Sequence, residues 1–257
     1  MIVRKSAAEV AKIDAAGDIL ADCLDMLAVE AKPGVSTADL DRLAEGFIRG
    51  RGGVPTFLGY RGFPGSICAS PNDMVVHGIP GAYRIAEGDI VSIDVGVTLD
   101  GYVADSAITL PMGTVEAEAL RLLDVTRESL EAGIAQCHEG ARLGDLSHAV
   151  QEVVEAAGFS VVRSLVGHGV GREMHEDPQI PNFGDPGRGP RLEEGMVFAI
   201  EPMVNAGGHE VFVADDGWSI STVDGSLSAH FEHTVAVGRK APRVLTRRSS
   251  EKGGAEG

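Results

Sequence analysis

Residues 85–97 read IAEGDIVSIDVGV, and residues 192–204 read LEEGMVFAIEPMV. The two stretches align without a gap at an offset of 107 positions, and each carries one carboxylate, Asp94 or Glu201, inside an apolar run. Similarity at a fixed offset indicates an internal repeat. We therefore expect a fold built from two similar halves, each with a carboxylate-bearing strand.

The repeat continues on both sides of these strands. A helix start, a His-Gly pair and a second carboxylate-bearing strand follow in the same order in each half. The matched segments are Gly34 to Leu40 with Gly140 to Leu146, His77 to Ile79 with His168 to Val170, and, more weakly, Ala104 to Ser106 with Phe231 to His233. Chance similarity of β-rich stretches is the alternative, and the shared order argues against it. The pattern favours two halves, about 1–113 and 114–238, around a pseudo-twofold axis.

Apolar residues at steps of three and four predict four helices, with short β-rich runs between them. The helices are expected from Val10 to Leu27, after Ser36 as N-cap, from Ala119 to Ile134 and from Leu146 to Ala157, and the strands at 90–97, 103–110, 196–200 and 234–237. These elements indicate an α+β fold, with one sheet system shared by the halves of a single domain, 1–238.

The charge is unevenly distributed along the 257 residues. The chain has 38 acidic and 22 basic residues, but residues 239–257 hold six basic and two acidic ones, which leaves residues 1–238 with a formal charge of −20. Nucleic-acid binding by this body is disfavoured because phosphate contacts require basic patches. We expect 239–257 to be a mobile, solvated tail, in preference to a basic arm for a polyanionic partner.

Two further observations concern the compartment. Apolar runs stay well short of the roughly 18–20 residues that a membrane helix needs, so no membrane partner is expected. Cys23, Cys68 and Cys137 cannot all pair and show no C-x-x-C spacing. This favours a reduced, cytoplasmic protein.

The carboxylates of the repeat predict a metal centre. Asp100-Gly101 is a hairpin signal that places Asp105 diagonally opposite Asp94 on one sheet face, roughly 7–8 Å apart at the backbone. Exposed strand-face residues are the alternative, and the apolar flanks argue against it. Glu201 and Glu232 repeat the arrangement, so four converging carboxylates carry −4, which two divalent cations balance. An oxygen-rich site suits Mn, Fe, Co or Zn.

Histidines and one cysteine are the other reactive candidates. His168 and His175 lie in the Gly-rich stretch 166–176. A lone histidine is more often structural, but two beside the carboxylate strands favour a role in the site. Cys68 is interpreted as a buried thiol in preference to a nucleophile.

From residue 3 to 238 the sequence resembles the type I methionine aminopeptidases. The matching motifs are Leu58 to Pro64, Ser66 to Cys68, Asn72, Val76 to Pro80, Ile93 to Val95, Ala104 to Ser106, Gly167 to Gly171, Met174 to Gly184, Ile200 to Met203 and Phe231 to Thr234. Together and in order they are highly specific. The resemblance implies the pita-bread (creatinase/aminopeptidase) fold, in which helices cover a curved antiparallel sheet.

The same resemblance implies roles for individual residues. The metal ligands are Asp94, Asp105, His168, Glu201 and Glu232, with Asp105 and Glu232 bridging. His77 and His175 contact the substrate, Glu201 moves a proton, and His175 stabilises the oxyanion. The implied methionine pocket contains Tyr60, Phe63 and Trp218 as aromatic walls, with Phe57, Cys68 and Met174 beside them, and a monovalent cation is expected near Asn72 and Ser228. Phe57, Met174 and His230 depart from the residues common in relatives, which are Cys, Phe and Gln.

The implied function is removal of the initiator methionine from nascent chains whose second residue is small and uncharged, through a hydroxide activated by two metal ions. The expected partners are N-terminal peptides at the ribosome, and the expected state is a monomer. One alternative is a proline-directed aminopeptidase or prolidase of the same fold, which would share the ligands but not the segment from Tyr60 to Cys68. The other is a metal-free binding protein, in which loss of a ligand is expected. The physiological metal stays open.

Overall fold

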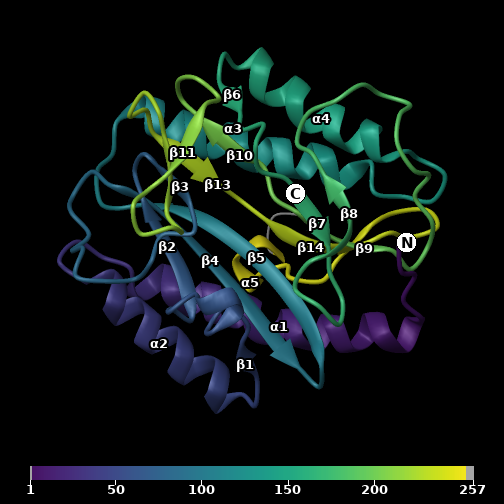
Figure 1. Ribbon diagram of the computed structural model, residues 1–257, viewed down its shortest axis with the longest axis horizontal. Helices are drawn as coiled ribbons and strands as arrows, with labels where there is room; N and C mark the ends of the chain where they lie inside the picture. Colours follow the sequence, from purple (N-terminus) through teal and green to yellow (C-terminus); the bar gives the residue numbers. More distant parts are fainter. Residues whose placement is uncertain (1, 253–257) are drawn as a thin grey trace.

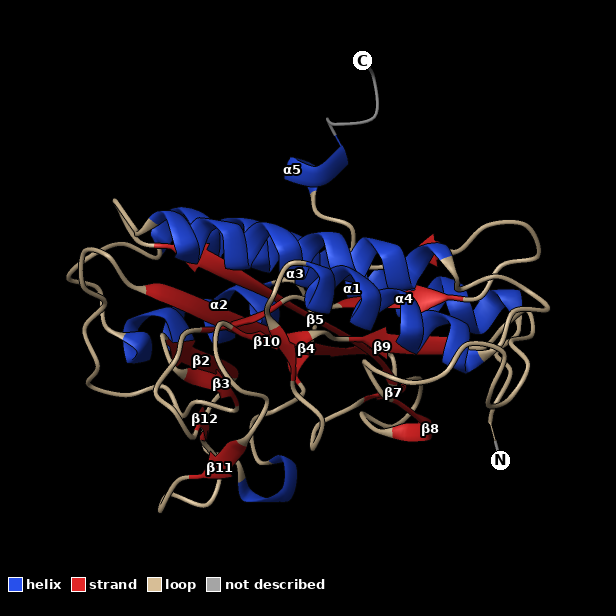
Figure 2. Cartoon of the chain, turned by 90° about the horizontal axis from the view of Figure 1, so that it is seen from above, coloured by secondary structure: helices blue, strands red, loops and turns tan. Residues whose placement is uncertain are grey.

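The computed structural model describes residues 2–252 and contains two layers (Figures 1 and 2). Helices α1 to α4 form one layer over the strands, and small strands and loops cover the opposite face of the strands. The first half contains α1 Ala7–Glu30, α2 Thr37–Gly50, β1 Val54–Pro55, the 3₁₀ turn η1 Tyr60–Gly62, β2 Ile67–Pro71, β3 Met74–Val76, β4 Ile90–Leu99 and β5 Tyr102–Pro111.

The second half begins again with two helices. It contains α3 Ala117–Ala135, α4 Leu143–Ala156, β6 Ser160–Val161, β7 Gly167–Gly169, β8 Glu176–Ile180, β9 Val197–Ile200, β10 Met203–Asn205, β11 Val211–Val213, β12 Ile220–Thr222, β13 Ser228–His230, β14 His233–Ala236, β15 Arg243–Val244 and α5 Ser249–Lys252. The four long helices and the four strands expected from the sequence are all present. The short strands between them were not anticipated.

Local sequence signals start the first two helices. Ser6 and Glu9 form a capping box before α1, and Ser36 and Asp39 form one before α2. Each pair satisfies backbone N–H groups that the first helical turn leaves without a partner. The apolar side of α1 is buried against β4 and β5. The N-cap expected at Ser36 is therefore confirmed.

The hairpin β4–β5 is the longest paired element of the fold. Its register runs from Ile90 opposite Pro111 to Leu99 opposite Tyr102, with Asp94 opposite Ala107. The turn residues Asp100 (φ 49°) and Gly101 (φ 75°) have the left-handed backbone that a two-residue hairpin of this kind requires. The register predicted from Asp100-Gly101 is confirmed.

The second half is paired less continuously. β9 pairs antiparallel with β14 on one side and with β7 on the other, and β10 pairs with β13 and β6 in a separate sheet. Pro202 separates β9 from β10. As a result, the carboxylates of this half lie beside strand ends.

The chain end corrects one expectation. Residues 243–252 were assigned to a mobile tail, but Leu245 is buried, and β15 pairs with β14. Arg247 forms an ion pair with Glu131, and Asp25 accepts hydrogen bonds from the backbone N–H of Ser249 and from the Ser250 hydroxyl. The basic residues of this segment thus find acidic partners on the body. Residues 253–257 of the expected tail lie outside the described part.

Two remaining features concern the helices and the cysteines. Across residues 2–252, none of the helices is long and apolar enough to cross a membrane. Cys23, Cys68 and Cys137 are all buried free thiols.

Candidate metal centre and substrate pocket

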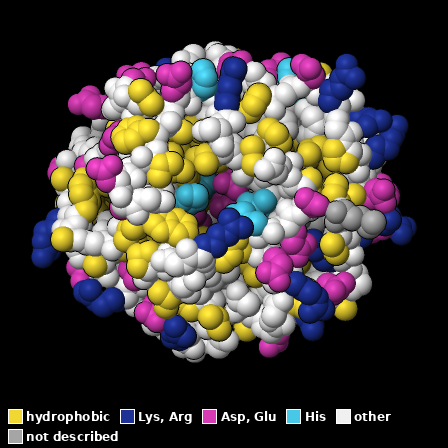
Figure 3. Space-filling model, in the orientation of Figure 1, with side chains coloured by type: hydrophobic (Ala, Val, Ile, Leu, Met, Phe, Trp, Pro, Cys, Tyr) yellow, Lys and Arg dark blue, Asp and Glu magenta, His cyan; other side chains and the backbone are white. Residues whose placement is uncertain are grey.

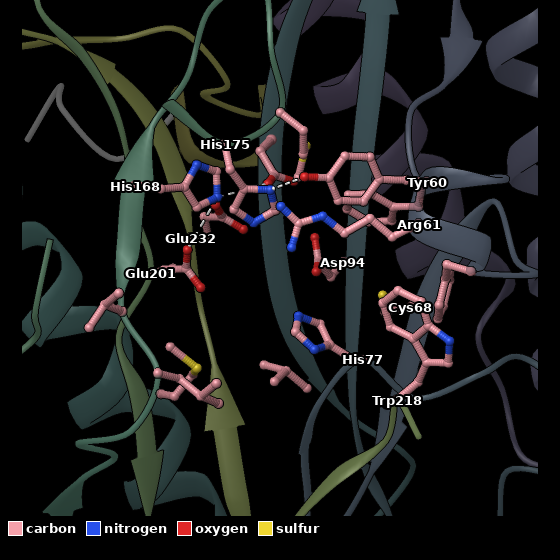
Figure 4. Close-up of a pocket in the computed structure, with 18 of the residues that line it drawn as sticks. Tyr60, Arg61, Cys68, His77, Asp94, His168, His175, Glu201, Trp218 and Glu232 are labelled. Carbon is pink, nitrogen blue, oxygen red and sulfur yellow. Dashed lines mark hydrogen bonds and ion pairs between the residues drawn. The ribbon is translucent and has the colours of Figure 1, made fainter. Parts of the chain in front are cut away.

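One cavity of about 280 Å³ is lined by all of the metal-ligand, catalytic and substrate-pocket residues expected from the sequence. Figure 3 shows acidic and histidine side chains at the floor of a hollow, with apolar side chains on one side of it. The close-up in Figure 4 shows how the labelled ones lie around the cavity. The predicted residues in its wall are Phe57, Tyr60, Phe63, Cys68, His77, Asp94, Asp105, His168, Met174, His175, Glu201, Trp218 and Glu232.

Four carboxylates converge from both halves. Asp94 and Asp105 come from the interior of β4 and β5, Glu201 follows β9, and Glu232 lies between β13 and β14. Burial raises the pKa of Asp94 to about 7. It also raises the pKa of the other three well above the usual range, and their neighbouring carboxylates reinforce the shift. Without a cation, the site therefore favours protonated acids.

His168 completes the group from β7. Its Nε2 lies 3.5 Å from Glu201 Oε1 and 3.7 Å from Asp105 Oδ2. Its Nδ1 is 3.0 Å from the Gly169 carbonyl oxygen, and an N–H donated there leaves the Nε2 lone pair facing the carboxylates. Burial, together with nearby His175, lowers the pKa of His168 to about 4, so the ring is neutral. A neutral imidazole is the form that binds metal.

The donor set fits divalent metal ions. One ligand atom each from Asp105, His168 and Glu232 lie within 4.8 Å of one another. Asp94 Oδ1, Asp105 Oδ1 and Glu232 Oε1 are buried and have no hydrogen-bond partner within the described chain. Buried oxygens of this kind are normally satisfied. Cations between them would satisfy all three and neutralise the charge.

Side-chain hydroxyls join the two halves at the backbones of Asp105 and Glu232. The Thr234 hydroxyl donates to the Asp105 carbonyl oxygen at 2.8 Å and accepts from the Asp105 N–H at 2.9 Å. The Ser106 hydroxyl donates to the Glu232 carbonyl oxygen, and the Glu232 N–H donates to the Ala107 carbonyl oxygen at 2.9 Å. We call Thr234 and Ser106 the hydroxyl seam. The seam fixes the backbones of two expected bridging ligands relative to each other.

Two histidines at the cavity belong to different halves. Burial lowers the pKa of His77 to about 4, and burial with nearby Arg61 lowers the pKa of His175. The Tyr60 hydroxyl lies 2.9 Å from His175 Nδ1. When this hydroxyl donates, the neutral His175 ring carries its proton on Nε2 and presents it as a donor.

The apolar end of the cavity is aromatic and sulfur-rich. Phe63 and Trp218 pack edge to face with centroids 5.1 Å apart. Cys68 is buried there, and burial raises its thiol pKa well above the usual range. It is therefore a poor nucleophile, consistent with the interpretation from the sequence.

Sequence reasoning missed several wall residues: Arg61, Val76, Ser164, Leu165, Val166 and Met203. Most of them adjoin a residue that it had identified, in the segments after Tyr60, before His77 and before Gly167. Adjacency to an assigned motif was the available signal. The four apolar ones, Val76, Leu165, Val166 and Met203, would equally suit the core by residue type alone.

The residues expected near a monovalent cation are neighbours in the structure. The Ser228 N–H donates to the Asn72 carbonyl oxygen at 2.9 Å, and Asn72 has a left-handed backbone (φ 55°). The Ser228 hydroxyl donates to Asn205 Oδ1 at 2.9 Å. Cation binding at this position stays a prediction.

Comparisons with known proteins define the class. The sequence model of metallopeptidase family M24 matches residues 11–239, and the chain belongs to this family. It is 51% identical to the methionine aminopeptidase of Clostridium acetobutylicum over 247 residues, which span 96% of this chain and 99% of that protein. It is also 51% identical to methionine aminopeptidase 1 of Bacillus subtilis, over 96% of this chain and all of that protein.

Comparison with solved structures leads to the same family. The methionine aminopeptidase structure from Thermotoga maritima matches with a TM-score of 0.95 and 44% identity, covering 96% of this chain and all of that one. Within the family, the chain is therefore a methionine aminopeptidase by sequence and by fold. The prolidase from Pyrococcus furiosus, at 21% identity and a TM-score of 0.76, covers 96% of this chain and 66% of its own and shares the fold alone. The predicted pita-bread architecture is confirmed, as is use of a divalent metal.

Proposed function

We propose that this protein removes the N-terminal methionine from polypeptides whose second residue is small and uncharged. The observation that carries the proposal is the union, in one cavity, of an ion-binding carboxylate cluster with an aromatic, sulfur-rich pocket. Thioether contacts with aromatic rings are favourable, so the apolar end suits a methionine side chain.

The proposed centre holds two divalent ions, of Co, Mn, Fe or Zn. Asp94, Asp105, His168, Glu201 and Glu232 are the proposed ligands, because two divalent ions would balance the −4 of their carboxylates and would satisfy the buried oxygens of Asp94, Asp105 and Glu232. When bound, the ions supply a water nucleophile that is ionised at neutral pH, and they polarise the scissile carbonyl.

The chain's own residues carry the rest of the reaction. The Glu201 carboxylate would accept the proton that the water releases on ionisation and pass it to the leaving amine. His175, held by Tyr60, would donate from Nε2 to the carbonyl oxygen as negative charge develops on it. His77, on the opposite wall, would orient the peptide.

Small second residues follow from the same geometry. His77 and His175 come from different halves and face each other across the carboxylate cluster (Figure 4). A long side chain on the leaving side would displace the scissile carbonyl. Phe57 and Met174 are buried in the wall and would change the shape of the methionine pocket relative to the Cys and Phe common in relatives.

Partner, compartment and oligomeric state belong to the proposal too. We expect the substrate to be the N-terminus of a nascent chain at the ribosome, in the cytoplasm, where three buried free thiols stay reduced. The monomer is the expected active form, because both halves of the site come from one chain. Binding of nucleic acid by residues 1–238 is not expected.

The test is reconstitution. The chelated protein is assayed on Met-Ala-Ser, Met-Leu-Ser and Ala-Pro-Ala before and after addition of Co²⁺ or Mn²⁺. Metal-dependent cleavage of Met-Ala-Ser alone is expected. Preferential cleavage of the proline peptide would favour the prolidase alternative, and turnover by protein shown by elemental analysis to be metal-free would reject the metal mechanism.

A further inference from the structure

The structure buries one histidine that nothing so far explains. His230, at the end of β13, is 2% exposed, and neither of its ring nitrogens has a hydrogen-bond partner among residues 2–252. Leaving a buried polar group unsatisfied destabilises the folded state. A phenylalanine would fill a comparable volume without that cost, so the imidazole calls for a role.

The backbone of His230 is held firmly. Its N–H donates to the Thr109 hydroxyl at 2.8 Å, and the same hydroxyl donates back to the His230 carbonyl oxygen at 2.8 Å. Met203 lies opposite His230 in the β10–β13 pair. The strand therefore determines where the ring can point.

The ring faces the second oxygen of Glu201. His230 Nε2 lies 3.9 Å from Glu201 Oε2, while His168 Nε2 lies 3.5 Å from Glu201 Oε1. The two carboxylate oxygens thus have different imidazole neighbours. Closing the 3.9 Å gap to hydrogen-bond distance takes a movement of about 1 Å, within reach of a small ring or carboxylate rotation.

We propose that His230 is a positioning residue that donates its Nε2–H to Glu201 Oε2. The bond would fix the orientation of the Glu201 carboxylate, with Oε2 held by His230 and Oε1 left available to a metal ion on the side of His168. The remaining Nδ1 is then a bare acceptor, which is tolerated in the interior better than an orphaned N–H. The proposal rests on the proposed function, because it refines the work of Glu201.

The resemblance leads one to expect glutamine at this position, and a glutamine carboxamide also presents an N–H donor. Donor capacity, more than ring shape, is therefore the property to vary. His230→Gln keeps a donor, whereas His230→Phe fills the space and removes it. His230→Leu replaces the phenylalanine variant if that protein does not accumulate.

His233 supplies the matched control. It is also buried, but its ring contacts the chain end: the Thr246 hydroxyl is 2.9 Å from its Nδ1, and Glu251 Oε2 is 3.5 Å from its Nε2. His233→Phe therefore removes a buried imidazole that does not face Glu201. We expect it to lower the melting temperature while kcat stays within about twofold of wild type.

The experiment measures kcat and KM on Met-Ala-Ser, Mn²⁺ binding to the apoprotein by calorimetry, and the melting temperature. For His230→Phe we expect kcat to fall by roughly 10–100-fold, as for a catalytic group misplaced by about 1 Å, with KM and metal stoichiometry unchanged. His230→Gln should recover kcat to within about threefold of wild type.

Other results overturn the proposal. It fails if His230→Phe keeps its kcat, if the glutamine variant is as slow as the phenylalanine variant, or if the loss of kcat follows a loss of bound metal or of thermal stability. In each of these cases wild-type cleavage of Met-Ala-Ser leaves the proposed function intact. A wild-type protein inactive on that peptide would count against the function itself.

Discussion

The two halves of the molecule contribute to the same site through different architecture. In the first half, Asp94 and Asp105 lie in the interior of ten-residue strands that are paired along their whole length. In the second half, Glu201 and Glu232 lie beside the ends of short strands. The repeat thus keeps the carboxylates while the backbone that carries them differs.

The matched histidines differ even more. His168 lies in β7 with its ring among the ligands, whereas His77 has a left-handed backbone (φ 59°) and lines the cavity. Duplicated positions have therefore separated into a proposed metal ligand and a proposed substrate contact.

The strongest test of this comparison removes one ligand charge from each half. Asp105→Asn and Glu232→Gln should each lower kcat/KM on the order of 100-fold or more, because replacing even an outer partner of a metal ligand costs about 10–100-fold. His77→Ala should cost less, since it only orients substrate. Steady-state kinetics and metal analysis measure both effects.

Asp100→Asn, at the exposed hairpin turn, is the control and should retain full activity. An Asp105→Asn protein that binds two ions and turns over at the wild-type rate would falsify the bridging role. Equal losses in Asp105→Asn and His77→Ala would contradict the proposal that Asp105 binds metal while His77 only orients the substrate.

The second test uses the two histidines as walls of one cavity. On a Met-Xaa-Ser series, we expect kcat/KM to fall by about 100-fold from Ala to Leu, since a displacement near 1 Å can cost that much. The measurement is kcat/KM for Xaa of Gly, Ala, Ser, Leu and Lys. A flat series would mean that the cavity is open on the leaving side.

Much of this comparison could be predicted from the sequence, because the signals that position the first-half carboxylates lie close to them along the chain. Asp100-Gly101 fixes the β4–β5 register within a dozen residues, so the relative position of Asp94 and Asp105 was predictable. The repeat then transferred the argument to Glu201 and Glu232. Which ring nitrogen faces which oxygen, as at His230, depends on packing between strands far apart in sequence.

The expectation of a mobile tail failed for residues 243–252 for a related reason. Composition identifies Arg247 and Arg248 as charges at a terminus, but it cannot show that Glu131 and Asp25 lie opposite them. The hydroxyl seam could not be predicted either. In the sequence Thr234 and Ser106 are ordinary strand residues, and their partners lie more than 120 positions away in the other half.

The third test uses the hydroxyl seam. It asks whether the hydrogen bonds that join the two halves contribute to metal binding when all the proposed ligand side chains are kept. Thr234→Val removes both hydrogen bonds to the Asp105 backbone and should weaken metal binding by roughly 10-fold, the lower end of the effect of outer partners. Calorimetry on the apoprotein measures it. Thr98→Val is the control, because its hydroxyl pairs with Thr56 at 2.8 Å away from the ligands.

The fourth test is the pH dependence of the metal-free protein. Raised folded pKa values of the four carboxylates mean that the native state binds more protons than the unfolded state, so stability falls as pH rises through the folded pKa values. Below about pH 6.5 the buried histidines, whose pKa is lowered to about 4 for His168 and about 3 for His230, oppose this trend. Above it they are neutral in both states.

Above about pH 6.5 we therefore expect the apoprotein to lose up to about 1.4 kcal/mol per pH unit for each excess proton that the native state holds. The metal-loaded protein should show a much flatter profile, because bound cations hold the carboxylates ionised. Denaturant unfolding of both forms across this range is the measurement. Parallel profiles would contradict the raised pKa values of the four buried carboxylates in the apoprotein.

The smallest effect concerns the chain end that packs behind both halves. Arg247 pairs with Glu131 of α3 through two hydrogen bonds and is 30% exposed, so Arg247→Ala should lower stability by about 0.5–1 kcal/mol. Arg239→Ala removes a pair with Glu194 that is far more exposed and should leave the melting temperature unchanged. Neither variant should alter kcat, since both residues lie outside the cavity wall. A kcat loss in Arg247→Ala alone would mean that residues 243–252 help to position Glu232 through β14. The chain end would then contribute to the active site as well as to stability.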